Sequence, residues 1–450
     1  MKQPFDLLVI GSGVAGRATA SICRKAGWKV AIAEQREIGG TCPLRGCDPK
    51  KILLGAAELL DATKRMNGKG ITSTDLAIDW PSLMRFKRTF TEPMPAHLTA
   101  NLEHQKISIL HGKATFLNNR QVLVAGETWE ARHFLIATGA EPAPLPIEGA
   151  SNLITSDEFL DLPNLPQRIV CVGGGFISME LSHLGVRCGR DVTVLEYLDR
   201  PLQPFDPDLV DRIVRKSREI GIRLKTGAQV KRITKNGHEF LVEALVSGTK
   251  MLFPADIVVH GAGRVPATRE LNLDAAQIVT EHGGIKVNEY LQSVSNPGVY
   301  AAGDVAATPS PQLTRVAAYQ GKLVAKNLLD GNKYPADHNG IPSVVFTIPS
   351  IATVGLSEQT ARDSSVSVNV RYEDMGDWFT TRKSAEATAA YKLITSNSSG
   401  QILGAHVLAH QSGEIINLFA MAIRLGLSVN DLKKVILAYP TEGAVSRYML

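Results

Sequence analysis

The chain has 450 residues, of which 44% are hydrophobic and 21% charged, a composition typical of a globular protein of roughly three domains and unlike that of disordered, collagenous or coiled-coil chains. The net charge of +5, without a dense basic run, favours neither a nucleic-acid partner nor an anionic membrane. No stretch reaches the ~18 uncharged apolar residues of a membrane-spanning helix, and the N-terminus runs directly into a strand-like segment, so we expect a cytoplasmic protein without membrane insertion.

The first predicted unit is a nucleotide-binding turn near the N-terminus. An apolar run over residues 5–10 leads into the glycine pattern G-x-G-x-x-G at 11–16, and a predicted helix and second strand follow up to Glu34. Such glycines let the backbone approach a pyrophosphate at a helix N-terminus, and the acid can bond ribose hydroxyls. The pattern therefore predicts a dinucleotide site.

Two of the five cysteines, Cys42 and Cys47, lie close together directly after this unit. A close pair in a reducing compartment is more often catalytic or metal-binding than structural. No second Cys/His pair with ligand spacing accompanies it, so a redox role is favoured over a structural disulfide or half of a metal site. A helix beginning near Cys47, with Lys50 beside it, would stabilise a thiolate there. The other cysteines are predicted to be small apolar fillers: Cys23, Cys171 and Cys188.

A second copy of the nucleotide pattern begins at Gly173 and ends at Glu196, with the same 23-residue spacing from glycine to acid. Ser178 replaces the third glycine, and a residue this small still permits close packing of helix and strand. Two dinucleotide sites in one chain predict a hydride relay between a bound flavin and a diffusible nicotinamide. Glu196 favours NADH, with NADP(H) the less favoured form, because a 2′-phosphate would face a carboxylate; Arg200 could soften this preference.

Breakpoints along the rest of the chain separate further segments. Prolines at 142–146 follow the first unit, the second unit closes near 256–261, and another strand leads to Asp304. From Pro342 onward the pattern changes to alternating strands, followed by an amphipathic helix over 412–425. This last part has no glycine fingerprint, so we do not expect a third nucleotide site there.

Taken in order, these motifs resemble the FAD-dependent pyridine nucleotide-disulfide oxidoreductases, a family that includes dihydrolipoamide dehydrogenase, glutathione reductase and mercuric reductase. The resemblance covers nearly the whole chain. Besides the two fingerprints it rests on GGTC-x4-C-x2-K at 39–50, ATG at 137–139, GRVP at 263–266, AGD at 302–304 and VGLSE at 354–358.

The resemblance implies an α/β fold with two Rossmann-like dinucleotide-binding domains and a C-terminal α/β dimerisation domain. Residues 1–148 and 262–338 would form the FAD-binding domain, 149–261 the NAD(P)-binding domain and 339–450 the dimerisation domain. The protein would be a homodimer, each active site being completed by the other chain's C-terminal segment.

The resemblance also implies roles for individual residues. Cys47 would be the charge-transfer thiol against the flavin, and Cys42 the interchange thiol that attacks the substrate. Lys50 would pair with Glu180 near the flavin, and Tyr439 stands where relatives carry a catalytic histidine. The expected cofactor-binding residues include Glu34 for the adenosine ribose, Asp304 for the ribityl chain and Phe176 as the nicotinamide gate. The full set is Gly11, Gly13, Ala15, Gly16, Glu34, Thr41, Thr138, Gly139, Gly173, Gly175, Phe176, Ile177, Glu196, Gly263, Arg264, Gly303, Asp304, Leu313 and Thr314.

The C-terminal motif departs from the family pattern. Thiol-disulfide members carry H-P-T-x-x-E there, whereas this chain has Tyr439 for the histidine and Ala444 for the glutamate, with Glu442 two residues early. A phenol with a pKa near ~10 is a poor base at neutral pH, so small dithiols should turn over slowly unless another group substitutes. The candidates are Tyr439 itself, His406, His410 and Glu414.

Three functions follow from this pattern. The first is an NAD(P)H-linked disulfide/dithiol oxidoreductase similar to dihydrolipoamide dehydrogenase, with electrons passing between NADH, FAD and the Cys42–Cys47 disulfide. The second is a reductase of a non-thiol acceptor such as a metal ion, a quinone or another electron carrier. The third is a redox-sensing flavoprotein, which the retention of a nicotinamide motif disfavours.

Overall fold

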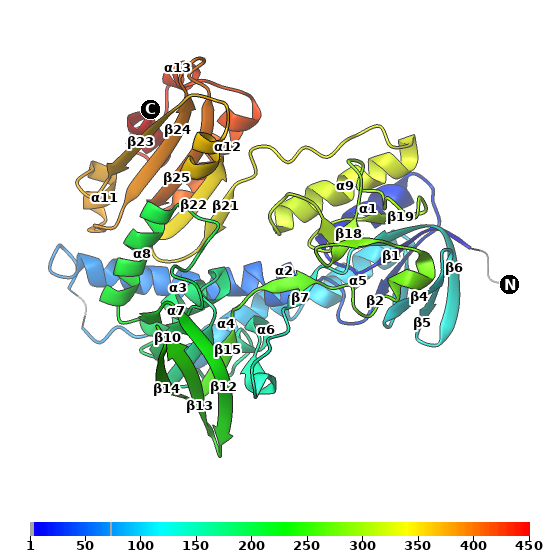
Figure 1. Cartoon of the computed structure of the whole chain (residues 1–450), viewed down its shortest axis with the longest axis horizontal. Coiled ribbons are helices and arrows are strands. Elements are labelled where there is room, and N and C mark those ends of the chain that lie inside the picture. Colours follow the sequence, from blue (N-terminus) through cyan, green and yellow to red (C-terminus); the bar gives the residue numbers. More distant parts are fainter. Residues whose placement is uncertain (1–3, 73) are drawn as a thin grey trace. The chain divides into compact units, whose positions relative to one another are not determined.

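The computed structural model describes residues 4–72 and 74–450, and these divide into two compact units (Figure 1). The first unit comprises the described residues of Met1–Lys50 together with Arg85–Ala143 and Arg264–His338, and the second comprises Lys51–Met84, Pro144–Gly263 and Asn339–Leu450. Among the described residues, no helix combines the length and apolar character needed to cross a bilayer. The mixed α/β architecture with parallel sheets confirms the predicted fold class.

The first unit is built on a parallel sheet in the order β3-β2-β1-β6, with β19 on the other side of β6 and the antiparallel β5 and β4 continuing the path. Residues of β1 are almost fully buried, as expected for a strand covered on both faces. Its elements are β1 (Phe5–Ile10), α1 (Val14–Lys25), β2 (Val30–Glu34), α2 (Thr41–Arg45), α5 (Met94–His104), β3 (Ser108–His111), β4 (Ala114–Asn118), β5 (Gln121–Val124), β6 (Glu127–Ile136), β7 (Ala140–Pro142), β16 (Arg264–Pro266), β17 (Thr280–Glu281), β18 (Gly284–Lys286), β19 (Val299–Ala301), β20 (Ala306–Ala307) and α9 (Thr314–Asp330).

Two helices run across the boundary between the units, α3 (Cys47–Met66) and α4 (Trp80–Thr91). Within the first unit, α1 and α9 approach closely because both carry a small residue at the contact. A Cβ added to Gly321 of α9 would lie 2.5 Å from the carbonyl oxygen of Ala15 in α1. The predicted start of a helix at Leu313 and Thr314 agrees with α9, for which Leu313 is the N-cap.

The second unit holds a parallel sheet in the order β11-β10-β9-β15-β8, the antiparallel β12-β13-β14, and an antiparallel sheet in the order β21-β22-β25-β24-β23. Helix α12, predicted over 412–425, covers one face of the last sheet (Figure 1). The elements are β8 (Leu153–Ile154), α6 (Ser156–Phe159), β9 (Arg168–Val172), α7 (Phe176–Arg187), β10 (Asp191–Leu195), α8 (Pro207–Glu219), β11 (Arg223–Lys225), β12 (Ala228–Asn236), β13 (Glu239–Val246), β14 (Thr249–Ala255), β15 (Ile257–His260), β21 (Ser343–Val345), β22 (Ser350–Gly355), α10 (Glu358–Asp363), β23 (Val368–Asp374), α11 (Phe379–Lys383), β24 (Ala390–Ser396), β25 (Ile402–Ala409), α12 (Ser412–Arg424), α13 (Val429–Lys433) and α14 (Ser446–Met449).

A buried lysine joins β24 to α8 and α10 inside the second unit. The side chain of Lys392 is 2% exposed, and its Nζ lies 2.8 Å from Asp206 Oδ2, 2.5 Å from Asp208 Oδ2 and 2.8 Å from Glu358 Oε2. Burial alone would lower the pKa of Lys392, but the hydrogen bonds to these carboxylates raise it above its ordinary value. The ammonium of Lys392 is therefore charged at neutral pH.

Lys392→Met should destabilise the second unit by about 3 kcal/mol, because it leaves the buried carboxylate of Asp206 without its cation. Urea denaturation followed by tryptophan fluorescence measures the change. The matched control is Lys250→Met: its Nζ lies 2.8 Å from Glu243 Oε2, but the lysine side chain is 61% exposed. That exposed pair should contribute less than about 1 kcal/mol, so equal losses in the two variants would contradict the prediction.

Candidate functional site

The first fingerprint forms a turn with no room for side chains at two of its glycines. Gly11 has φ +103°, and a Cβ on it would lie 2.4 Å from the carbonyl oxygen of Ala137. A Cβ on Gly16 would lie 2.1 Å from the carbonyl oxygen of Gly11. Gly13, by contrast, has open space before it and caps α1 without a side chain. The start of α1 thus presents backbone N–H groups to whatever anion lies in front of the turn.

Glu34, at the end of β2, is hydrogen-bonded back to this turn. Its Oε2 accepts from the backbone N–H of Ser12 at 2.9 Å and from the Ser12 hydroxyl at 2.8 Å, while its Oε1 accepts from the N–H of Arg36 at 2.9 Å. The Ser12 hydroxyl also accepts from the N–H of Gly39 at 3.0 Å. Glu34 is half-buried, and its place at the strand end is where the resemblance expects the adenosine ribose.

The cysteine pair lies on two successive helices of the first unit. Cys42 belongs to α2 and Cys47 begins α3; both are free thiols, Cys42 partly buried and Cys47 exposed. Cys47 Sγ lies 3.5 Å from the hydroxyl oxygen of Thr314, the first residue of α9. Cys42 Sγ lies 3.9 Å from Asp48 Oδ1, to which it donates.

The two thiols differ in acidity because one donates to the other. The hydrogen bond from Cys42 lowers the pKa of Cys47 to about 6, burial opposing this shift while the Thr314 hydroxyl and the charge of Lys50 support it. The same bond, together with burial, raises the pKa of Cys42. The reduced pair therefore carries its negative charge on Cys47 at neutral pH.

Two loops of the first unit are held by hydrogen bonds from side chains to backbone carbonyls. The Thr138 hydroxyl donates to the carbonyl of Ala267 at 2.7 Å, and the Arg264 guanidinium donates to the carbonyl of Ala140. Burial raises the pKa of Asp304, and the charge of Arg264 opposes the shift. A partly desolvated carboxyl of this kind is suited to accept from a hydroxyl group.

The second fingerprint carries Ser178 in place of its third glycine, and the residue that faces this serine from the end of a strand is itself a glycine, Gly261. Ser178 is fully buried, and its Oγ lies 1.9 Å from where a Cβ on Gly261 would be. The glycine that the pattern lacks at 178 is thus supplied opposite it, after β15. The sequence predicts that Ser178 is tolerated, but it holds no local signal for Gly261, because the need for a glycine there depends on which strand faces the helix.

Glu196 holds the loop of the second fingerprint and is 8% exposed. One oxygen, Oε2, accepts from the backbone N–H of Gly174, and the other, Oε1, accepts from the N–H of Leu198 at 2.7 Å. Gly173 has φ +93°, with Ala262 directly against it. Phe176 is the first residue of α7 and is 49% exposed, as a gate beside a nicotinamide would be.

Glu180, on the same helix, is 1% exposed and its Oε1 accepts from the backbone N–H of Phe346 at 2.8 Å. Lys50 is half-buried in the first turn of α3. The two belong to different units, so their pairing stays a prediction. The cofactor roles assigned to the other predicted residues likewise stay predictions.

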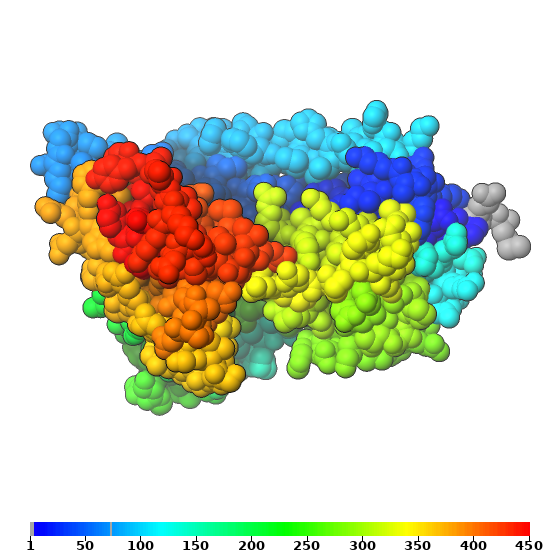
Figure 2. All heavy atoms as spheres, turned by 90° about the horizontal axis from the view of Figure 1, so that it is seen from above, coloured from blue at the N-terminus to red at the C-terminus, as the bar shows by residue number. Residues whose placement is uncertain are grey.

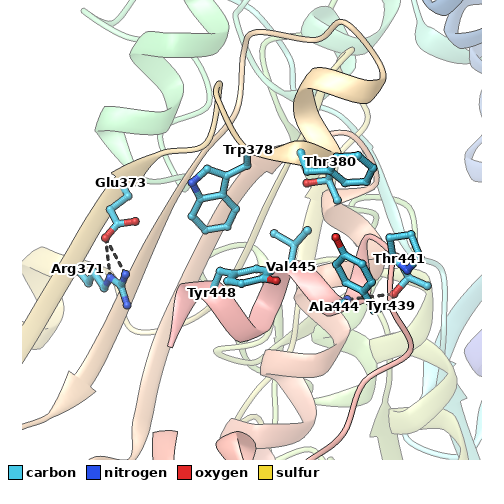
Figure 3. Close-up of a pocket in the computed structure, with 11 residues that line it drawn as sticks. Arg371, Glu373, Trp378, Thr380, Tyr439, Thr441, Ala444, Val445 and Tyr448 are labelled. Carbon is cyan, nitrogen blue, oxygen red and sulfur yellow. Dashed lines mark hydrogen bonds and ion pairs between the residues drawn. The ribbon is translucent and has the colours of Figure 1, made fainter.

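Tyr439 belongs to the C-terminal segment of the chain, which is red in Figure 2, and lines a cavity of about 350 Å³ (Figure 3). It is 71% exposed. The cavity has aromatic walls from Trp378, Phe379 and Tyr448, and the Arg371–Glu373 ion pair, at 2.8 Å, lies at one side. Its residues come from β23, α11 and the C-terminal segment.

The groups proposed to replace the missing histidine differ from one another in burial and in hydrogen bonding. Glu442, the acid of the C-terminal motif that is not one of these candidates, has its Oε1 3.0 Å from Lys383 Nζ, so its charge is paired. His406 is 2% exposed, with its ring nitrogens 2.6 Å from Thr353 Oγ1 and 3.1 Å from the carbonyl of Leu356. Burial lowers the pKa of His406, so it is a poor candidate for the base. His410 and Glu414 are exposed.

Comparison with known proteins decides the family. The model of the pyridine nucleotide-disulphide oxidoreductases matches residues 5–321, and that of their dimerisation domain matches residues 341–447. The chain belongs to the pyridine nucleotide-disulphide oxidoreductase family. It is accordingly an enzyme, an oxidoreductase that uses FAD and NAD(P)H, as the sequence predicted.

Relatives with different printed names match over most of this oxidoreductase. A mercuric reductase from Staphylococcus aureus is 34% identical over 95% of this chain and 78% of its own length. A glutathione reductase from Burkholderia cepacia is also 34% identical, over 98% and 97%. A dihydrolipoyl dehydrogenase from Chlamydia muridarum is 31% identical over 99% and 96%. The Cu(II) complex of the HOCl-induced flavoprotein disulfide reductase RclA from Escherichia coli superposes with a TM-score of 0.88 at 27% identity, covering 99% and 98%.

The first fingerprint of the oxidoreductase fits FAD. The space before Gly13 and the helix start without a side-chain cap suit a pyrophosphate, and Glu34 and Asp304 offer oxygens for hydroxyl groups. The residues that would hold FAD are the glycines of the turn together with these two acids. The residues that would hold a nicotinamide dinucleotide are the glycines of the second fingerprint together with Glu196.

Alkylation of reduced protein by iodoacetamide should modify Cys47 with a rate that rises with pH through a midpoint near 6, since only the thiolate reacts. Peptide mass spectrometry at each pH gives the rate. Thr314→Val should move the midpoint upward, because it removes a hydrogen bond to the thiolate.

Two controls accompany this measurement. Cys188, whose pKa burial raises to about 12, should remain unmodified at neutral pH. Thr308→Val changes a threonine of the same unit that bonds to Gln320, and it should leave the midpoint in place. A midpoint at the ordinary thiol value of about 8.5 would show that Cys42 and Thr314 do not stabilise the thiolate.

Proposed function

We propose that this oxidoreductase exchanges electrons between NADH and a disulfide or dithiol substrate through a redox-active Cys42–Cys47 pair. The observation that carries the proposal is the placement of Cys47 at the start of α3 with its Sγ 3.5 Å from the Thr314 hydroxyl. The hydrogen bonds from Cys42 and Thr314 lower the pKa of Cys47, while the pKa of Cys42 is raised. FAD, when bound, supplies the coupling between two-electron hydride chemistry of the nicotinamide and dithiol chemistry. The similarity to a dihydrolipoyl dehydrogenase and a glutathione reductase supports the same substrate class.

The difference in acidity between the two thiols determines which sulfur is attacked and which one leaves during thiol–disulfide exchange. A substrate thiolate attacks the Cys42 sulfur of the protein disulfide, the S–S bond breaks, and Cys47 leaves as a thiolate. Attack on this sulfur is favoured because the thiol of lower pKa is the better leaving group. The second substrate thiol, after losing its proton, attacks the mixed disulfide and releases Cys42, so one disulfide forms as one is lost. Cys42 then takes up a proton, as its raised pKa requires.

NADH is the proposed nicotinamide because of Glu196. Its carboxylate lies at the end of β10 and is held by two backbone N–H groups, so a 2′-phosphate would meet a fixed negative charge. We also infer a homodimer, since residues 341–447 match the family's dimerisation domain and the exposed Tyr439 lies within it.

A second candidate function is reduction of a non-thiol acceptor such as a metal ion or a quinone. It is favoured by the phenol at Tyr439 and by the ion pair that occupies Glu442, which together leave no imidazole–carboxylate couple in the C-terminal motif. An acceptor that takes electrons without needing a proton on a departing thiol suits this arrangement. One relative is named a mercuric reductase, and the superposed RclA structure is a Cu(II) complex. Both names are consistent with a metal ion as the acceptor.

Anaerobic titration of FAD-loaded protein with NADH tests the proposal. One equivalent should raise the number of free thiols by two, and alkylation mapping should place both new thiols at Cys42 and Cys47. NADPH should act more slowly. Dihydrolipoamide should produce the same two thiols if small dithiols are substrates. Reduction by NADH with no new thiols would overturn the role of the pair.

Tyr439→His separates the two candidate functions. If the substrate is a dithiol, a restored imidazole should raise the turnover of dihydrolipoamide at least about tenfold at neutral pH. Tyr448→His, in the wall of the same cavity, is the matched control and should not raise it. If the wild-type enzyme is slow with dithiols and Tyr439→His gives no gain, the second candidate function is favoured, with metal ions and quinones as the acceptors to test.

A further inference from the structure

Asp48 directly follows the second cysteine in the sequence, and its carboxylate lies beside the first one. Asp48 Oδ1 is 3.9 Å from Cys42 Sγ, which donates to it. Because a thiol is a weak donor and sulfur is a large atom, this contact is long. The other groups that act on the Cys42 sulfur are Cys47 and the Thr314 hydroxyl. Asp48 therefore supplies the carboxylate at this sulfur.

The turn between α2 and α3 brings the thiol and the carboxylate together. Cys42 belongs to α2 and Asp48 to the first turn of α3, six positions further along the chain. Between them, a Cβ on Gly46 would lie 2.9 Å from the carbonyl oxygen of Thr41, so a side chain there would force the turn open. The contact thus depends on the same tight turn that places Cys47 at the start of α3.

The Asp48 carboxylate is exposed and is not committed to a cation. Among the residues that the structure describes, no lysine or arginine forms an ion pair with it. Two other acids differ in this respect, because Glu37 lies 3.1 Å from Arg45 and Glu442 lies 3.0 Å from Lys383. Asp48 can therefore take up a proton and give it back without breaking an ion pair.

Cys42 needs such a group because it keeps its proton in the reduced pair. Its hydrogen bond to Cys47, burial and the charge of Asp48 all raise its pKa. We propose that Asp48 is the acid/base group for Cys42, holding the proton that moves when this sulfur exchanges with a substrate, in place of the imidazole that Tyr439 does not provide. This inference rests on the proposed role of Cys42 as the interchange thiol. General acids and bases act through a direct hydrogen bond or through one water.

One proton passes through Asp48 in each direction of exchange. When a substrate disulfide is reduced, Cys42 gives its proton to Asp48 and the thiolate attacks one substrate sulfur. The Cys42–substrate S–S bond forms, the substrate S–S bond breaks, and the leaving thiolate takes the proton from Asp48. When a dithiol is oxidised, Asp48 takes the proton of the second substrate thiol and returns it to the released Cys42 sulfur. Asp48 ends each exchange as a carboxylate.

Comparison of two uncharged disulfides tests the proposal without NADH turnover. FAD-loaded Cys47→Ser protein is reduced with dithiothreitol, desalted and mixed at neutral pH with hydroxyethyl disulfide or dithiodipyridine, and mixed disulfides at Cys42 are followed by peptide mass spectrometry. The alkyl thiolate is a poor leaving group without a proton, whereas the aromatic thiolate, of much lower pKa, leaves readily. Asp48→Asn should therefore lower the ratio of the alkyl rate to the aromatic rate at least about tenfold. Asp48→Glu should recover most of this ratio.

Glu37→Gln is the matched control, because it removes a carboxylate from the loop before α2 that pairs with Arg45 rather than with Cys42. It should leave the ratio unchanged. An unchanged ratio in Asp48→Asn, an equal fall in Glu37→Gln or no recovery in Asp48→Glu would each overturn the proposal. Failure of NADH to generate the two thiols in protein with both cysteines would instead refute the proposed function and leave the measured ratio standing.

Discussion

The contact between the nucleotide turn and the cysteine loop constrains the rest of the first unit. A Cβ on Gly40 would lie 2.7 Å from the Gly13 Cα, so Gly40 cannot carry a side chain, and Ser12 and Arg17 add hydrogen bonds to Gly39. Two turns joined in this way cannot move independently. The backbone that faces a dinucleotide and the backbone that presents the reactive sulfurs therefore form one rigid feature, and binding at one fixes geometry at the other.

The same region brings two helix starts to one sulfur. Cys47 begins α3, and Thr314, which begins α9, has its hydroxyl 3.5 Å from that sulfur. Both helices present their positive ends, and Lys50 adds a full charge one turn along α3. Negative charge accumulates on Cys47 as a result, and Cys42 keeps its proton as the donor of the pair. The fold, rather than an external base, sets which of the two thiols ionises first.

Features with a strict backbone requirement could be predicted from the sequence. Gly11 and Gly173 have positive φ and lie against neighbouring backbone, so the glycine pattern reports the turn directly. The cysteine pair and the helix that starts at Cys47 follow from local sequence in the same way.

Contacts that depend on tertiary packing could not be predicted. The hydroxyl of Thr314 reaches Cys47 across 267 positions of sequence, and nothing near Arg17 indicates that its partner is the carbonyl of Gly39. His406 shows the converse, because a histidine in an alternating strand gives no sign of whether its ring is exposed or, as here, buried and hydrogen-bonded. The domain boundaries and the Lys50–Glu180 pair concern both units and stay predictions.

The pairing of Ser178 with Gly261 has an evolutionary consequence. A methyl group gained at 261 clashes with the serine, and a glycine restored at 178 leaves an unfilled gap, so the two sites are epistatic. A lineage can exchange them only by passing through a less well packed intermediate.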